Sequence, residues 1–291
     1  MFLSSLRSCR LLTFLAVPPL LVAASTPSLA QSAASKPTAK PALVGWAKGT
    51  TEGVFVAGGY FPGAGWREDF QAQSSVNPGT MWSLMNLTGT RAQLVTDRAK
   101  SMDGPAGYFA EARRNVDPRA EAQQGLALSA THAKNAQPRL PRAQSLNQPL
   151  YAQAAAGLLQ QAGFKAKSAR LSQLLRVDLN GDGTEEVLIS AHSRSDYGRT
   201  PEVKKGDYNL VAIRFVHQGK VKTVPLDMEI ARKTVAFAAP NRSEFLACAD
   251  IDGDGRMEIV VSTGYYEGWG MEFYKFDGQK VSRVLSAGWG A

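Results

Sequence analysis

Residues 177–187, with the sequence VDLNGDGTEEV, recur seventy-two positions later as residues 249–259, ADIDGDGRMEI. Both copies place an acidic or amide side chain at the first, third, fifth and ninth positions of a nine-residue loop, and glycine at the sixth. A short run of β-forming residues follows each copy, at 188–190 and 260–262. This self-similarity predicts repeated units of strand, glycine turn and strand, of the kind found in blades or solenoids.

The spacing of the oxygen-bearing side chains predicts two calcium sites. Calcium binds about six to eight oxygen atoms from carboxylates, carbonyls and water. Alternate side chains of a tight turn point inward, and glycine at the sixth position permits the sharp bend. One such turn is also compatible with an ordinary exposed β-turn, but two matching copies favour an ion. The expected ligands are the side chains of Asp178, Asn180, Asp182 and Glu186 with the carbonyl of Thr184, and the side chains of Asp250, Asp252, Asp254 and Glu258 with the carbonyl of Arg256.

The two loops differ in formal charge at their third position. Asn180 in the first loop stands where Asp252 supplies a carboxylate in the second, so the ligand side chains sum to −3 and −4. Because a more negative cage attracts a divalent cation more strongly, we expect the second loop to bind calcium more tightly.

An EF-hand is excluded, because its loop needs a bidentate glutamate at position 12, where this chain has Ile189 and Val261. The flanking residues are also typical of strands rather than helices. The two loops and their flanking strands resemble the calcium loops of FG-GAP and VCBS repeat proteins, in which an Asp-x-Asp/Asn-x-Asp-Gly-x-x-Asp/Glu turn joins two strands. The resemblance implies β-propeller-like blades, calcium as a structural ion, and a role in adhesion or surface recognition. With two recognisable repeats, a closed ring is not expected.

The first thirty residues predict an export signal. Arg7 and Arg10 precede an apolar run, and residues 28–30, Ser-Leu-Ala, fit a small-x-small cleavage site. We therefore expect a secreted or periplasmic protein, and no later stretch is apolar enough to cross a bilayer. Residues 31–43, rich in Ala, Ser, Lys and Pro, are typical of a flexible spacer.

The rest of the chain predicts a mainly β fold with one clear helix. Residues 44–135 contain short β-like runs punctuated by glycine, including a hairpin through residues 88–89. The polar, proline-rich residues 136–149 predict a linker. Leucine and alanine recur at helical spacing over residues 150–163, which end on a glycine suited to a C-cap. Residues 150–291 thus comprise this helix and the two calcium-loop repeats, the first of which carries an insertion near 193–207.

Charge is divided unevenly along the chain, whose formal net charge is +8. Residues 31–177 hold 17 basic against 8 acidic residues, or +9, whereas residues 178–291 hold 14 against 17, or −3. The basic half suits anionic polysaccharide or lipid headgroups, although its charges are scattered rather than clustered. Nucleic acid is not an expected partner of an exported chain.

Few other residues suggest chemistry. Cys248 lies in an apolar, strand-like run that predicts a buried and inert thiol. The sequence contains none of the common hydrolase, phosphate-binding or zinc motifs. One turn contains Tyr265, Tyr266, Glu267 and Trp269, whose side chains either stack on sugar rings and accept hydrogen bonds, or fill space between neighbouring strands.

These observations predict an exported, calcium-binding β-repeat protein that acts as a binding or adhesion module rather than an enzyme. Its expected partner is a cell-surface glycan or protein. Two alternatives remain open. One is a secreted hydrolase or hydrolase accessory domain that acts on polysaccharide, with its active site in residues 44–135. The other is a purely structural envelope protein. The sequence does not indicate an oligomeric state.

Overall fold

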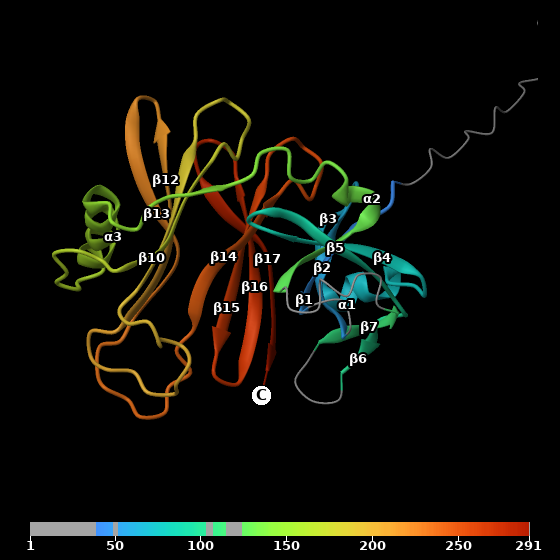
Figure 1. The fold of residues 1–291 in the computed structure, drawn as a ribbon, viewed down its shortest axis with the longest axis horizontal. Helices are drawn as coiled ribbons and strands as arrows, with labels where there is room; N and C mark the ends of the chain where they lie inside the picture. The colour runs from blue at the N-terminus through green and yellow to red at the C-terminus, as the bar shows by residue number, and fades with distance from the viewer. Residues whose placement is uncertain (1–38, 49–51, 103–106, 115–123, 291) are drawn as a thin grey trace, which may run out of the picture. The chain divides into compact units, whose positions relative to one another are not determined.

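The computed structural model describes residues 39–48, 52–102, 107–114 and 124–290 (Figure 1). These residues form seventeen β-strands and three α-helices, of which α1 (Asp69–Ala72) and α2 (Ala130–Ala133) have only four residues each. The predicted mainly β fold is therefore confirmed. The predicted signal peptide and residues 31–38 of the predicted spacer lie outside the described residues. No helix within the described ranges is long and apolar enough to cross a membrane.

The N-terminal sheet contains eight antiparallel strands in the order β3-β2-β1-β8-β4-β5-β7-β6, and β2 additionally pairs with β7. Because β2 pairs with both β1 and β7, the sheet curves around a core that includes Val54, Trp82 and Leu94. A 3-10 turn, η1 (Gln73–Ser75), follows α1. The strands are β1 (Ala42–Lys48), β2 (Gly53–Phe61), β3 (Gly65–Glu68), β4 (Thr80–Asn86), β5 (Gly89–Thr96), β6 (Lys100–Ser101), β7 (Tyr108–Arg114) and β8 (Gln124–Ser129).

Two details of this sheet bear on the sequence expectations. The predicted hairpin through residues 88–89 is present as β4 and β5. The predicted spacer, by contrast, ends before Ala42, because Ala42 and Leu43 are buried residues of β1 that pair with Tyr60 and Gly59 of β2. Pairing with β2 therefore places Ala42 and Leu43 in the sheet, although the composition of residues 31–43 is typical of a spacer.

Two further sheets each contain one of the recurring loops. Both are antiparallel meanders, and their register at the loop is equivalent, since Val177 pairs with Glu186 and Ala249 with Glu258. The predicted strand–turn–strand unit is therefore present twice. The first repeat sheet contains β10 (Leu171–Val177), β11 (Glu186–His192), β12 (Tyr208–His217) and β13 (Lys220–Ile230), with short β9 (Arg142–Ala143) beside β10. The second repeat sheet contains β14 (Arg242–Ala249), β15 (Glu258–Tyr265), β16 (Gly268–Phe276) and β17 (Val281–Gly290).

The insertion predicted near residues 193–207 forms the connection between β11 and β12, where the second repeat has only a two-residue turn. One buried carboxylate organises this connection. Asp207 accepts hydrogen bonds from the Ser193 hydroxyl (2.9 Å), from Arg194 Nε (3.0 Å) and from the backbone N–H of Lys204 (2.9 Å). The two ends of the inserted loop are thereby held together.

Helix α3 (Pro149–Gln161) packs on the first repeat sheet. Proline lies at its start, where a missing N–H leaves no hydrogen bond unmade. Gly163, with a φ of 80°, follows its C-cap, as the sequence predicted. The helix buries Leu158 and Leu159 against sheet residues that include Leu174 and Ile189. One face of the first repeat sheet is thus covered by a helix rather than by another sheet.

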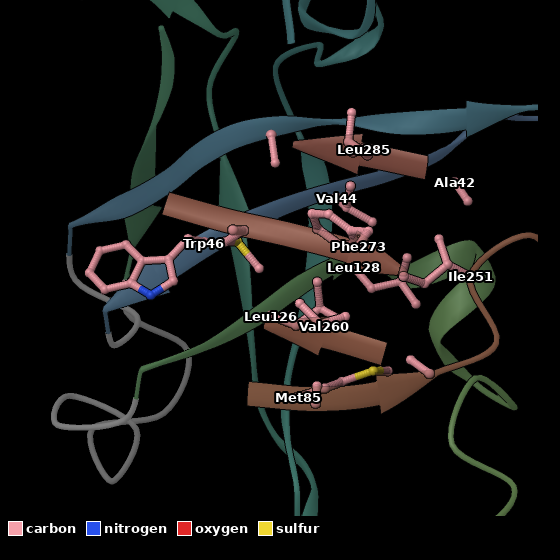
Figure 2. Close-up of a cluster of buried hydrophobic side chains, with 14 of the residues drawn as sticks. Ala42, Val44, Trp46, Met85, Leu126, Leu128, Ile251, Val260, Phe273 and Leu285 are labelled. Atoms are coloured by element: carbon pink, nitrogen blue, oxygen red, sulfur yellow. The ribbon is translucent and has the colours of Figure 1, made fainter. Parts of the chain in front are cut away.

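Equivalent faces of the two repeat sheets pack against the layer that precedes them in the chain or in the stack, and the opposite faces pack against the next layer. Val187 on β11 packs with α3, whereas its neighbour Leu188 packs with the second repeat sheet. The equivalent residues of β15 behave alike, because Ile259 packs with the first repeat sheet and Val260 packs with the N-terminal sheet beside Met85 (Figure 2). Helix α3, the first repeat sheet, the second repeat sheet and the N-terminal sheet therefore form successive layers.

Residues 136–149, predicted as a linker, are bonded to all three sheets. They contribute β9 to the first repeat sheet. The side-chain amide of Gln137 donates to the carbonyl of Asn86 in the N-terminal sheet (2.9 Å) and to that of Cys248 in the second repeat sheet (3.1 Å). The segment thus crosses the ends of the sheets close to the recurring loops.

Candidate metal centre

The two acidic loops have nearly the same backbone. Four glycines, two in each loop, adopt left-handed conformations: φ is 76° and 85° at Gly181 and Gly183, and 76° and 86° at Gly253 and Gly255. Residues with a Cβ rarely adopt these angles. The glycine spacing therefore fixes the backbone of the loop, and this backbone determines the direction of the side chains between the glycines.

The first-position aspartates support the turn from within. The two oxygens of Asp178 accept hydrogen bonds from the N–H groups of Gly181 (2.7 Å) and Gly183 (3.1 Å). Those of Asp250 accept from the equivalent N–H groups, at 2.9 and 3.0 Å. Since each N–H points toward the carboxylate, the aspartate side chain is held inside the loop.

The side chains at the third and fifth positions also turn inward. Asp182 Oδ1 accepts from the N–H of Thr184 (2.7 Å), and Asp254 Oδ1 accepts from the N–H of Arg256 (2.9 Å). At the third position Asp252 Oδ1 accepts from the N–H of Asp254 (3.2 Å), as Asn180 does in the first loop. Asp250, Asp252 and Asp254 each have one carboxylate oxygen that lies within 4.8 Å of those of the other two residues. The structure therefore brings these three predicted ligands of the second loop together.

The glutamates at the ninth position are buried, and each one accepts a hydrogen bond from the second residue of its own loop. Glu186 Oε2 accepts from the N–H of Leu179 (2.9 Å), and Glu258 Oε2 accepts from the N–H of Ile251 (2.8 Å). Glu258 has no exposed surface, and its Oε1 has no hydrogen-bond partner among the described residues. A buried carboxylate oxygen without a donor is costly unless a cation lies beside it.

Burial and neighbouring carboxylates make these glutamates weak acids. Burial, followed by the charge of Asp252, raises the pKa of Glu258 to about 8. Burial also raises the pKa of Glu186 to about 7, with further contributions from the charges of Asp182 and Asp178. Without a cation these surroundings therefore disfavour the ionised form of both glutamates, and a bound cation would favour it.

A lysine that sequence reasoning missed reaches the second loop. Lys275, on β16, forms ion pairs with Asp252 and with Asp254 (2.8 Å), and its Nζ lies 3.9 Å from Glu258 Oε1. Although burial lowers the pKa of Lys275, the hydrogen bonds that its ammonium group donates to Asp252 and Asp254 outweigh burial and raise the pKa. No local motif marks this residue, because it comes from a neighbouring strand rather than from the loop.

The two loops are neighbours rather than separate features. The backbone N–H of Met257 donates to the carbonyl of Leu179 (2.8 Å). Arg139, from the predicted linker, donates through Nε to the carbonyl of Asp178 (2.6 Å) and through Nη2 to that of Gly255 (2.9 Å). One guanidinium thus bridges both loops, a role that the sequence did not reveal.

The aromatic turn between β15 and β16 divides into two pairs of residues. Tyr265 and Trp269 line a cleft of about 470 Å³, whereas Tyr266 and Glu267 are exposed and do not line it. The Trp269 ring lies 5.3 Å from that of Trp46 in the N-terminal sheet. Trp269 therefore packs between strands and lines a cleft at the same time.

The polar groups of this cleft include two arginines. Arg242 forms an ion pair with Glu244 (2.5 Å) and donates to the carbonyl of Ser195 (2.8 Å). The guanidinium of Arg199 is exposed and has no hydrogen-bond or ion-pair partner within the part of the chain that the structure describes. The indole N–H of Trp269 also has no partner there. The cleft thus offers aromatic surface and the exposed guanidinium of Arg199, with the carboxylate of Glu52 also in its lining, whereas the indole N–H of Trp269 is buried.

The cleft and the second acidic loop lie at opposite ends of β15. This strand begins at Glu258, which closes the loop, and ends at Tyr265, which lines the cleft. Seven residue steps of a strand span about 23 Å. Binding in the cleft is therefore geometrically separate from the acidic loops.

A second cleft, of about 790 Å³, is lined by parts of the N-terminal sheet and the residues around it. Ser74, Asn77, Ser129, Thr131 and Lys40 supply most of its polar groups. The lining residues of this cleft, all within the described ranges, include no carboxylate and no histidine.

Two further side chains of possible chemical interest are buried. The predicted burial of Cys248 is confirmed, and burial raises the pKa of its thiol to about 12. His192 is fully buried and its Nε2 lies 3.1 Å from the carbonyl of Ser243. Burial, followed by the charge of Arg242, lowers the pKa of His192. Neither residue lines the clefts described above.

No protein-family model matches the chain, and no curated protein and no solved structure shows significant similarity to it.

Proposed function

We propose that this protein is a calcium-binding β-repeat protein in which each acidic loop binds one structural Ca²⁺ ion. The observation that carries the proposal is the buried Oε1 of Glu258, which has no hydrogen-bond donor among the described residues and faces the same loop as Asp250, Asp252 and Asp254. Carboxylate oxygens in a tight turn are the ligands that calcium prefers. Thr184 and Arg256, the predicted carbonyl ligands, occupy the seventh position of their loops.

The first loop supports the proposal by its equivalence to the second. Asp178, Asp182 and Glu186 make the same backbone hydrogen bonds as their counterparts seventy-two positions later. In the protein as described, the side-chain amide of Asn180 donates to Asp182 Oδ2 (2.9 Å). Calcium would be held by the carbonyl oxygen of Asn180 and by the three carboxylates.

The layered packing favours a propeller-like arrangement of the two repeats. Successive blades of a propeller present the same face to the preceding blade, and the two repeat sheets do so here. This agrees with the resemblance of the loops to FG-GAP and VCBS repeats. We propose two blades in an open stack rather than a closed ring, because α3 and the N-terminal sheet cover the two outer faces.

Calcium titration tests the structural role of the ions. At about ten times its dissociation constant, a ligand that binds only the folded state stabilises it by ~1.4 kcal/mol, which raises the melting temperature of a chain of this size by roughly 3–6 °C per site. We expect this increase on moving from chelator to millimolar Ca²⁺, and a smaller one with Asp250→Asn.

Asp277→Asn is the matched control, because Asp277 also accepts turn N–H groups, those of Gln279 and Lys280, but lies outside both loops. Its calcium response should equal that of the unaltered protein. Identical melting of the unaltered protein in chelator and in calcium would contradict the proposal.

We further propose that the calcium-loaded protein is a binding or adhesion module of the cell surface or periplasm, and that the cleft beside Trp269 is its ligand site. Aromatic faces stack on the apolar faces of sugar rings, and Trp46, Tyr265 and Trp269 line this cleft. The unpartnered Arg199 suits a carboxylate. The expected ligand is therefore an acidic sugar of a surface polysaccharide.

An array of neutral and uronic-acid-containing glycans tests this ligand class. Removing a charge-assisted contact costs about 1.5–3 kcal/mol, so Arg199→Ala should weaken acidic glycan binding by at least roughly ten-fold without changing calcium affinity. Arg98→Ala, which removes another exposed arginine, should bind normally. Binding to no glycan at all would leave a structural envelope role as the better explanation.

A further inference from the structure

We infer that Lys275 is an internal cation of the second loop, which takes the place of a metal ion when calcium is scarce and which calcium must displace. The inference rests on the proposed calcium function and concerns a residue outside the loop motif. It assigns the two loops different affinities and different dependence on calcium.

The ammonium group of Lys275 lies among the carboxylates of the second loop. Lys275 Nζ lies 2.8 Å from Asp254 Oδ2, 3.9 Å from Glu258 Oε1, and is also paired with Asp252. Asp252, Asp254 and Glu258 are three of the four predicted side-chain ligands of the second loop. A cation that contacts all three occupies the region where their oxygens converge.

The two repeats differ at the position of Lys275. Val187 of the first repeat pairs with Arg214, and Ile259 of the second pairs with Tyr274. One residue further along each strand, Phe215 therefore corresponds to Lys275. Phe215 is buried, and its ring lies 4.9 Å from that of Phe276 between the two repeat sheets. The first loop thus receives no cation from the equivalent position.

Lys275 also balances the charges of the two loops. The second loop has a carboxylate at Asp252 where the first has the neutral Asn180, and it has the charge of Lys275 where the first has the neutral Phe215. With every ligand carboxylate ionised, as calcium binding requires, and with Lys275 counted, the second loop sums to −4 + 1 = −3, the same as the first loop. The additional acid and the additional base occur in the same repeat and contact each other.

Two consequences follow for calcium. In the second loop the ion must compete with a tethered ammonium group, so the extra carboxylate gives no advantage, and the first loop becomes the tighter site. This reverses the ranking expected from the loop residues alone. The second loop, in addition, keeps Asp252 and Asp254 paired without calcium. In the first loop, no lysine or arginine among the described residues forms an ion pair with Asp178, Asp182 or Glu186.

The test measures the second loop by itself. In an Asp178→Asn background, which disables the first loop, Lys275→Met should raise calcium affinity by about ten- to one-hundred-fold, because it removes a unit charge from within a few ångströms of the ion. Lys275→Arg keeps the charge and should stay within a few fold of the parent. Lys220→Met is the control, since Lys220 is an exposed lysine of the first repeat, at the turn between β12 and β13.

A second readout does not need calcium binding. In chelator, Lys275→Met should melt at a lower temperature than Lys220→Met, because Asp252 and Asp254 lose their partner. Equal calcium affinity for Lys275→Met and its parent, or equal melting of the two methionine variants in chelator, would overturn the role of Lys275. Absence of calcium binding in every variant, including one with an intact first loop, would instead overturn the proposed function.

Discussion

The ninth-position glutamates show how one residue type meets two different surroundings. Glu258 shares its loop with three aspartates and with Lys275, whereas Glu186 shares its loop with two aspartates and Asn180. One oxygen of each glutamate accepts a hydrogen bond from a backbone N–H of its own loop. What differs is the charge around the remaining oxygen, and this is where we expect the two sites to diverge in their response to calcium.

Asp207 supports a prediction about pH at the scale of a single residue. Burial raises its pKa, but hydrogen bonds from the Lys204 N–H, Arg194 and Ser193 outweigh this effect and hold the pKa below its ordinary value. A depressed carboxyl pKa contributes stability above the unfolded value of about 3.9, and this stability is lost as pH falls through the folded pKa. Asp207→Asn should therefore destabilise the protein by about 1–3 kcal/mol at neutral pH.

The check on this prediction is chemical denaturation of both proteins at pH 7 and below pH 4. The difference between them should shrink at low pH, where the aspartate of the unaltered protein becomes protonated. Asp196→Asn is the comparison, because Asp196 pairs with the same Arg194 (2.7 Å) but is more than half exposed. A difference that does not depend on pH would point to lost packing rather than lost charge.

Most of the candidate metal ligands were predictable because they are close together in sequence. Alternation within nine residues is enough to place Asp250, Asp252 and Asp254 on the inside of one turn. Lys275 and Arg139 were not predictable, because they reach the loops from a different strand and from the segment before α3. Nothing in their local sequence distinguishes them from other surface cations.

At the scale of elements, glycine has opposite effects in the loops and in α3. A Cβ added at Gly183 would meet no atom within 4 Å, but φ there is 85°, so Gly183→Ala should cost about 1 kcal/mol through backbone strain alone. Gly157 lies inside α3 and also has open space around it. Gly157→Ala should therefore stabilise the protein by roughly 0.5–1 kcal/mol.

Thermal or urea unfolding in chelator measures both variants without any contribution from calcium. Since neither substitution changes a contact, their opposite signs isolate the backbone term. If Gly183→Ala were neutral, the loop would be able to adopt another turn, and the glycine spacing would lose its structural meaning.

Elements with a local signal were predicted well, and those held by distant partners were not. Helix α3 has its own periodicity and C-terminal glycine, and the β4–β5 hairpin has its own turn. The start of β1 and the two-residue β9 have neither. Their composition is that of a spacer or a linker, and only pairing with β2 and with β10 makes them strands.

At the scale of the whole described chain, the order of layers accounts for the small number of repeats. A sheet with apolar residues on both faces needs cover on both, and in a long array of repeats the neighbouring repeats supply that cover. In this protein α3 covers the first repeat sheet and the N-terminal sheet covers the second. The sequence could not predict this, because the strands of the N-terminal sheet carry no loop motif and their apolar residues do not show which sheet they face.

The same packing has a consequence for how the protein reaches its folded state. Val44, Trp46 and Leu126 of the N-terminal sheet are buried by residues of β14–β17, which include Val260 and Phe273 (Figure 2). A growing polypeptide that has been translated only as far as residue 241 lacks every one of these covering strands. Until residues 242–290 emerge, the apolar surface of the N-terminal sheet that these strands cover stays open to water and to other chains.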